Sequence, residues 1–398
     1  MRRILTFLTA IVLLLVSLGV GVFTADLPFW RRALQLPLPA DGAYLPVAVI
    51  GVPGAEPLPK AAAGTQAFDE LVVEESVNRA RGAGSRALLV MYRGTLQIER
   101  YFLTDDAGTL LPAALVARPL TAMAIGIAQA DGRIGSLDTP VAHYLKEWDD
   151  GARGRITLRQ LLQETSGLET GGDIRGLPYR SPWEDLAKLP AFATAKGVRM
   201  LLGNDFESSA LGFRLDHEPG GFYNVSPANI QLAAVILERA TGKSFESYVD
   251  ERLWGPMGAG RAELQLDRRA GMPAAHCCWR ATARDMLRIL SLLGTDGKHA
   301  NRAVLPAGWV SEMARASRVN AETGMQVTRL TIEGDEALGV TDANGSAFWV
   351  IPRRELAILN ITNPGGMSLP ELPELLLKGL EAPAPEKPAP VKPAPVKK

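Results

Sequence analysis

Apolar residues recur at helical spacing through the middle of this chain. In residues 111–128, LPAALVARPLTAMAIGIA, one continuous apolar face carries Leu120, Met123, Ala124, Ile127 and Ala128. This pattern is typical of a helix buried inside a domain. Proline is tolerated in the first turn of a helix, where its missing N–H is not needed. Pro119 therefore predicts a helix that begins near Leu115.

Helical patterns also cover residues 66–83, 229–241, 282–293 and 372–380. Residues 87–102, ALLVMYRGTLQIERYF, predict two strands joined by a tight turn at Arg93 and Gly94. SAFWVIP (346–352) and ELAILNIT (355–362) are strand-like. We therefore expect an α+β fold, in which an antiparallel sheet of N- and C-terminal strands joins residues 86–102 to strands near 346–361. Helices flank this sheet, residues 120–130 form a central helix behind it, and a helical subdomain is added.

The start of the chain predicts membrane attachment. Arg2 and Arg3 precede residues 4–25, which are 22 residues without a charge. That length can cross a bilayer, and the basic end should stay in the cytoplasm. We expect residues 1–25 to be a single-pass anchor in the cell membrane, with the domain on the periplasmic, extracytoplasmic side. The alternative is a cleaved signal peptide, which Phe23 disfavours because the cleavage site needs a small residue there.

Two further segments flank the domain that we expect at residues 66–380. Residues 26–65 are rich in Pro, Ala and Gly and predict a linker or an extended arm on the domain, with Trp30, Arg31 and Arg32 at the membrane interface. Residues 381–398 are rich in Pro and Lys. They predict a disordered end or a basic polyproline II spacer that reaches an anionic envelope polymer or a protein partner.

The composition excludes several classes of function. The chain has 398 residues and a net charge of zero, so nothing suggests nucleic acid as a partner. Cys277 and Cys278 are adjacent and cannot connect distant segments, so we expect no disulfide framework. The motifs Gly-x-Ser-x-Gly, His-Glu-x-x-His and Cys-x-x-Cys and a phosphate loop are missing, so neither a cofactor nor a metal is expected. We expect the four histidines to be structural: His143, His217, His276 and His299.

Several segments share the pattern of one known family. They include ADGRIGSLDTPVAHYL, ITLRQLLQETSGLE, HCCWRATARDMLRILSLL and LPAGWVSEM. Together they resemble the serine β-lactamase and penicillin-binding-protein superfamily, especially its class C and esterase-like branch, from about Phe68 to Pro364. The resemblance implies a β-lactamase/DD-peptidase-like fold and an active site built from three motifs. It also places Ser166 in a structural turn, so we do not expect this serine to be a nucleophile.

The first motif of that family is Ser-x-x-Lys at the start of a buried helix, where the lysine helps to deprotonate the serine. The resemblance places Leu115 at the serine and Arg118 at the lysine. Leucine has no nucleophilic atom, and arginine cannot release a proton near neutral pH. No lysine of the chain has a serine three residues before it, so a different register does not restore the motif.

The other two motifs also lack the family's residues. Tyr-x-Asn or Tyr-x-Ser corresponds to Tyr223, with Val225 at the third position, and we expect Tyr223 to be a buried tyrosine with a paired hydroxyl. Lys-Thr-Gly or His-x-Gly corresponds to the segment DANGSAFWVIP, with Ala343 at the basic position and Gly345 as a turn residue. No catalytic motif of the family is therefore intact.

These losses favour a membrane-anchored pseudoenzyme with a binding or regulatory role in the cell envelope. One alternative is an active serine-type hydrolase of amides or esters that uses relocated residues, and another is a folded remnant without activity. If a cleft persists, Arg118 and Tyr223 are the candidate ligand-binding residues, because a guanidinium at a helix N-terminus suits an anionic envelope ligand. In the opposing interpretation, Arg118 pairs with a neighbouring carboxylate and Leu115 fills the pocket.

Overall fold

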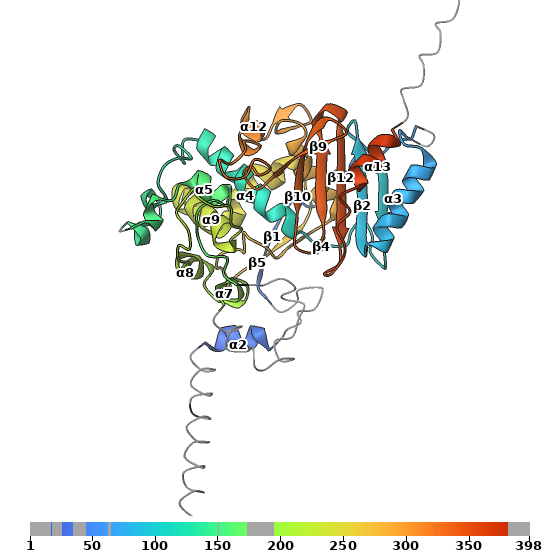
Figure 1. Cartoon of the computed structure of the whole chain (residues 1–398). Helices are drawn as coiled ribbons and strands as arrows, with labels where there is room; N and C mark the ends of the chain where they lie inside the picture. Colours follow the sequence, from blue (N-terminus) through green and yellow to red (C-terminus); the bar gives the residue numbers. More distant parts are fainter. Residues whose placement is uncertain are drawn as a thin grey trace, which may run out of the picture.

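The computed structural model describes residues 17, 26–34, 45–62, 65–149, 151–172 and 195–380. Their main element is a six-stranded antiparallel sheet of order β3-β2-β12-β11-β10-β9 (Figure 1). Its strands are β2 (Ser85–Tyr92), β3 (Thr95–Tyr101), β9 (Thr328–Ile332), β10 (Asp335–Thr341), β11 (Ala347–Ile351) and β12 (Leu356–Thr362). Strand β2 pairs with β12, with Leu89 opposite Leu359. The predicted sheet of N- and C-terminal strands is confirmed.

The turn between β2 and β3 is the tight hairpin that the sequence predicts. Arg93 and Gly94 have φ angles of 48° and 74°. Positive φ at both central residues defines a type I′ turn, whose twist matches that of the flanking strands.

The two faces of the sheet are covered by different helices. Successive side chains of a strand point to opposite faces. Leu88 and Val90 of β2 belong to the cluster formed with α3 (Glu70–Gly82) and α13 (Leu372–Lys378). Ala87 and Leu89 belong to the larger core with α4 (Ala114–Ala130) and α11 (Ala283–Leu290). Figure 1 shows α3 and α13 on one side of the sheet and α4 on the other.

Helix α4 is the predicted central helix. Every residue from Leu115 to Ala128 is buried except Arg118. The expectation that Pro119 lies in the first turn is wrong, because Pro119 is the sixth residue of α4. Its missing N–H leaves the carbonyl of Leu115 without the usual donor four residues later.

The helical subdomain packs beside α4. Its main helix is α9 (Pro227–Thr241), which contacts α4, α5 (Leu158–Leu162), α7 (Lys196–Leu202), α8 (Phe206–Leu211) and α10 (Phe245–Val249). A second sheet, which the sequence analysis did not predict, has the order β1-β5-β6-β4, with β1 (Val47–Ile50), β5 (Ala262–Gln265), β6 (Trp279–Ala281) and β4 (Leu111–Pro112). Because β4 ends one residue before the N-cap of α4, its pairing with β6 fixes where α4 begins.

Short elements complete the described part of the chain. They are α12 (Trp309–Met313), β7 (Lys298–His299), β8 (Arg302–Ala303), a π-helical turn (Asp250–Trp254) and 3₁₀ turns at Val141–His143, Lys146–Trp148, Arg153–Arg155, Gly255–Met257, Ser291–Leu293 and Pro352–Arg354.

Gly126 allows α12 to pack closely on α4. A Cβ atom at Gly126 would lie 2.2 Å from Cε2 of Trp309. We expect Gly126→Ala to lower the free energy of unfolding by about 2 kcal/mol, because a buried indole has to move. Urea denaturation measures this effect. Gly82→Ala is the matched control, since that helical position is open and alanine should be neutral or stabilising there. Equal stability of Gly126→Ala and the wild type would contradict this packing.

The segment before the domain folds onto it. Helix α2 (Leu27–Ala33) packs against α7, and Trp30 is only 4% exposed in that contact. The prediction that Trp30 and Arg32 lie at a membrane interface is therefore wrong, because Trp30 is inside the protein and Arg32 donates to the carbonyl of Leu202. Residues 45–62 lie along the domain as an extended arm. Strand β1 of this arm pairs with β5, and the Ala61 N–H donates to the carbonyl of Leu96.

Within the described ranges, no helix is long and apolar enough to cross a membrane. The predicted span at residues 4–25 lies outside the described residues except for Ser17, and the predicted tail at 381–398 lies outside them entirely.

Candidate functional site

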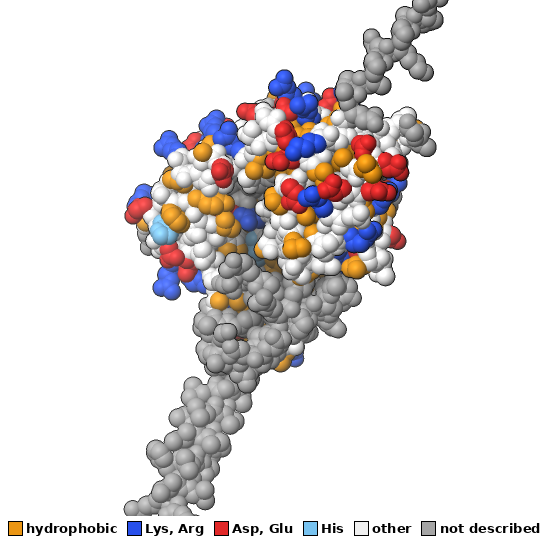
Figure 2. Space-filling view, turned by 45° about the vertical axis from the view of Figure 1, so that its right-hand side comes forward, with side chains coloured by type: hydrophobic (Ala, Val, Ile, Leu, Met, Phe, Trp, Pro, Cys, Tyr) orange, Lys and Arg blue, Asp and Glu red, His pale blue; other side chains and the backbone are white. Residues whose placement is uncertain are grey.

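A cavity of about 690 Å³ opens between the main sheet, the start of α4 and the helical subdomain. Figure 2 shows the molecule hollowed between its helical part and the sheet. All five positions that the resemblance places in the three motifs line this cavity: Leu115, Arg118, Tyr223, Val225 and Ala343. The fold thus brings the three motif positions together, although the residues there differ from those of the family.

Leu115 occupies the position where a nucleophile would stand. It is the second residue of α4, and its side chain is 1% exposed. A leucine there contributes an apolar wall and no reactive atom. The cavity remains open around it, so Leu115 does not fill the pocket.

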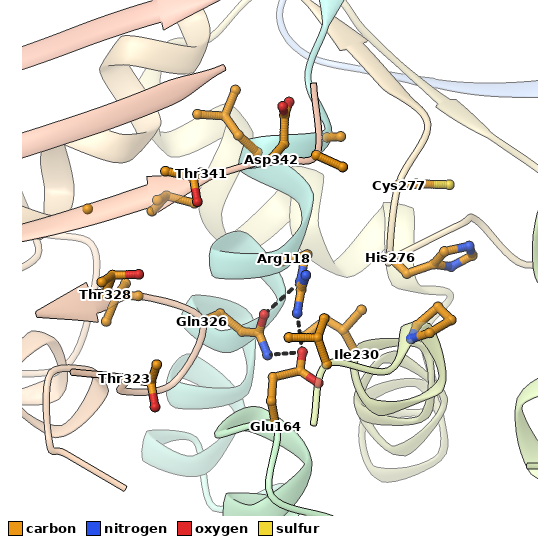
Figure 3. A pocket seen from close by; sticks show the side chains of 18 of the residues that line it. Arg118, Glu164, Ile230, His276, Cys277, Thr323, Gln326, Thr328, Thr341 and Asp342 are labelled. Carbon is orange, nitrogen blue, oxygen red and sulfur yellow. Dashed lines mark hydrogen bonds and ion pairs between the residues drawn. The ribbon is translucent and has the colours of Figure 1, made fainter. Parts of the chain in front are cut away.

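Arg118 is bound by two side chains across the cavity floor. Its guanidinium forms an ion pair with Glu164 and donates through Nε to Oε1 of Gln326 at 2.8 Å. Gln326 in turn donates through Nε2 to the same Glu164 oxygen at 2.9 Å. Figure 3 shows the three side chains pointing toward one another. The interpretation in which Arg118 pairs with a neighbouring carboxylate is confirmed.

Glu164 is the buried centre of this network. It is 3% exposed, and its second oxygen accepts from the Ser226 N–H at 3.0 Å and from Nδ2 of Asn229 at 2.5 Å. Donors from several segments therefore satisfy one buried carboxylate, as burial of a charge requires. We name Arg118, Glu164 and Gln326 the floor network.

Two members of the floor network, Glu164 and Gln326, were not predicted from the sequence. The available signal was the acidic residue in LLQETSG, directly after an apolar helical stretch. The family resemblance instead places that segment in a structural turn. This assignment is confirmed for Ser166, whose buried hydroxyl donates to Asn229 Oδ1 at 2.5 Å and accepts from the Leu168 N–H at 3.1 Å.

Tyr223 is half-buried and faces the cavity, and its hydroxyl has no hydrogen-bond partner among the described residues. The expectation of a buried tyrosine with a paired hydroxyl is therefore wrong. Burial raises the pKa of the Tyr223 phenol, and the negative charge of Glu164 raises it further. Tyr223 is consequently a neutral hydrogen-bonding group at physiological pH. Val225 is 44% exposed and presents only methyl groups.

The turn after β10 carries the third motif position. Ala343 leaves that position without a positive charge, and its neighbour Asp342 adds a carboxylate to the lining. Oδ1 of Asp342 accepts from the N–H groups of Asn344 and Ser346, at 2.8 and 3.1 Å. Burial raises the pKa of Asp342. Gly345, with φ of +88°, is the predicted turn residue.

His276 and Cys277 form another wall of the cavity. Nδ1 of His276 lies 2.9 Å from Oε1 of Gln231, and burial lowers the pKa of the imidazole to about 3, with a smaller contribution from Arg118. Its ring points away from Arg118 (Figure 3), which fits the structural role expected for it. Cys277 is bonded to Cys278. Because the two cysteines are adjacent, this disulfide connects no distant segments, and a bond between them was not predicted from the sequence.

The remaining predicted features add no chemistry to the cavity. His143 and His217 are exposed, and His299 is partly buried, away from the cavity lining. Within the described ranges, no three His, Cys, Asp or Glu side chains cluster in a way that could hold a metal ion.

The sheet with α4 behind it and the three motif positions around one cavity define the fold class of serine β-lactamases and penicillin-binding proteins. The family model described as beta-lactamase matches residues 68–379. This chain belongs to that family.

Proteins from several organisms are similar to this chain. The chain is 23% identical to a 6-aminohexanoate-dimer hydrolase from Paenarthrobacter ureafaciens, over 70% of each protein. It is 27% identical to a D-aminopeptidase from Cereibacter sphaeroides, over 41% of this chain but only 28% of that relative. A Bacillus anthracis structure described as a 6-aminohexanoate-dimer hydrolase superposes with a TM-score of 0.66 at 20% identity, covering 84% of this chain and 89% of its own.

Proposed function

We propose that this protein binds an amide-containing ligand in the cavity without hydrolysing it, and that residues 4–25 anchor it to the cell membrane with the domain on the extracytoplasmic side. The observation that supports the loss of catalysis most directly is the start of α4. Leu115 occupies the nucleophile position there, and Arg118 is bound into the floor network.

The other hydroxyl groups of the cavity are poor substitutes for a nucleophilic serine. A hydroxyl becomes nucleophilic when a neighbouring base accepts its proton. The Tyr223 phenol has a raised pKa. The hydroxyl of Thr323 is directed to the carbonyl of Asn320. Among the described residues, the hydroxyls of Thr170, Thr328 and Thr341 have no hydrogen bond to a carboxylate, imidazole or amine. The cavity is therefore suited to binding.

The charge of the cavity argues against the anionic ligand that the sequence analysis considered. The positive charge of Arg118 is met by Glu164, and His276 is neutral. Asp342 is the remaining carboxylate of the lining. An acidic ligand would meet no unpaired cation among the described lining residues, whereas an uncharged amide could use the free phenol of Tyr223 and the threonine hydroxyls. Amides are also the natural ligands to test first, because the relatives named above include amide-cleaving hydrolases.

We expect short linear amides with blocked, uncharged ends, such as N-acetylated amides of 6-aminohexanoate oligomers and of D-amino acid peptides, to raise the melting temperature. At a ligand concentration of 100 times Kd the rise should be about 3–6 °C. Ala343→Trp should abolish it by obstructing the part of the cavity beside Asp342. Ala55→Trp is the control, since that alanine is exposed and does not line the cavity. Thermal-shift titration measures the binding, and intact-mass analysis of the ligand shows whether the amide is cleaved. No response to any amide would contradict the binding role, and cleavage of the amide would favour the alternative of a hydrolase with relocated residues.

A further inference from the structure

Helix α2 has two apolar faces. The inner face carries Phe29, Trp30 and Ala33, which are buried against α7. The outer face carries Leu27, Pro28, Arg31 and Leu34, all exposed, with 44% exposure for Leu27 and 60% for Leu34. These outer positions are one, three and three residues apart, so they lie along one side of the helix. We name them the outer face of α2; it contains no acidic residue.

The inner face fixes α2 to the domain through polar contacts as well as packing. Arg32 donates to the carbonyls of Leu202, Gly203 and Asp267, three backbone groups of the helical subdomain and the segment after β5. Arg199 of α7 pairs with Asp26, and its guanidinium lies 4.2 Å from the ring centroid of Phe29. A helix held at both its N-cap and its last turn has a defined orientation on the domain.

The uncharged segment 4–25 ends immediately before this helix. Asp26 follows it directly and is the N-cap of α2, where its Oδ1 accepts from the Phe29 N–H at 3.3 Å. No residues are left for a linker between a membrane span and the docked helix. If residues 4–25 span the membrane, the outer face of α2 would therefore lie at the surface of the bilayer, where the span leaves the hydrocarbon core.

We infer that the outer face of α2 rests on the outer surface of the phospholipid bilayer and holds the domain in one orientation at the membrane. This inference rests on the membrane anchoring in the proposed function. Leucines enter the interfacial region of a bilayer, and an arginine there keeps its guanidinium among the lipid phosphates while its methylenes face apolar groups. The composition of the outer face, two leucines, a proline and one arginine, fits this partner.

The test uses the full-length protein reconstituted in vesicles of phosphatidylcholine and phosphatidylglycerol. Leu34→Cys places a spin label on the outer face, and Leu71→Cys places one on α3, where Leu71 is 74% exposed. The chain has two cysteines, Cys277 and Cys278, and they are bonded to each other, so the introduced thiol is the reactive one. Electron paramagnetic resonance then compares relaxation by oxygen, which is enriched in lipid, with relaxation by a water-soluble nickel chelate.

We expect the label at position 34 to show at least a threefold higher oxygen-to-nickel ratio than the label at position 71. Equal ratios in protein that floats with the vesicles would overturn the inference while leaving the anchoring intact. Failure of the protein to float would instead contradict the anchoring. Dipolar broadening between labels at position 34 that persists on dilution with excess lipid would show that a second copy covers this face, and it would also overturn the inference.

Discussion

The variant Leu115→Ser is expected to remain unreactive toward fluorophosphonates and labelled penicillin, as is the wild type. A serine at position 115 would stand at the start of α4 without a base. Arg118 stays protonated near neutral pH and is already bound by Glu164 and Gln326. Loss of the catalytic serine or its base lowers kcat by about 10⁶-fold in a well-studied serine protease, and the residues act as a unit. Restoring the serine alone should therefore restore almost no reactivity.

Intact mass spectrometry after prolonged incubation measures this outcome. The double change Leu115→Ser with Arg118→Lys is an informative companion, because it rebuilds the first motif. We expect it also to stay silent, since a lysine at position 118 would pair with the buried carboxylate of Glu164 and remain charged. A stoichiometric serine adduct on the single variant would refute the proposed reason for inactivity. An adduct on the double variant alone would show that the floor network leaves a lysine free to act.

The second large effect concerns stability. We expect Arg118→Met to lower the free energy of unfolding by about 3 kcal/mol, because it removes the counter-charge of a carboxylate that is 3% exposed. Gln326, Ser226 and Asn229 would still donate to Glu164, so the loss should stay at the lower end of the range for broken buried ion pairs. Chemical denaturation monitored by tryptophan fluorescence provides the measurement.

A double-mutant cycle separates the ion pair from simple loss of packing. Arg118→Met with Glu164→Gln removes both charges, and this variant should be more stable than Arg118→Met alone. Arg159→Met is the matched control, because Arg159 also forms ion pairs but with Asp138 and Glu312, whose side chains are 63% and 20% exposed. Arg159→Met should lower the free energy of unfolding by less than about 1 kcal/mol. If the two single arginine variants lose the same stability, the burial of Glu164 has no special effect.

Long periodic segments were predictable from the sequence, and short or nonlocal features were not. Helices α9 and α11 repeat their apolar residues over several turns, and β2 and β3 flank a turn with a clear signal at Arg93 and Gly94. Strand β4 has two residues, Leu111 and Pro112, and owes its existence to pairing with β6. No local pattern could indicate such a strand, because its partner is about 170 positions away.

The candidate site shows the same division. The family resemblance predicted the places of Leu115, Arg118 and Tyr223, and all three line the cavity. Pairing of Arg118 with a carboxylate was one of two interpretations, but its partners could not be named, since Glu164 and Gln326 are 46 and 208 positions away in the sequence. The docking of Trp30 was missed for a related reason. A tryptophan beside two arginines after an apolar segment has the composition of a membrane interface, and only the position of α7 shows that it is buried.

The pairing of β2 with β12 has a consequence for how the protein is made. Strand β2 is synthesised early, but its partner β12 ends at Thr362, close to the end of the domain. The sheet cannot close until nearly the whole domain has emerged, so one edge of the β2–β3 hairpin stays unpaired throughout synthesis. Such long-range pairing slows folding and leaves the unfinished chain prone to aggregation. Any chaperone that assists this fold would therefore have to cover that edge until residue 362 is available.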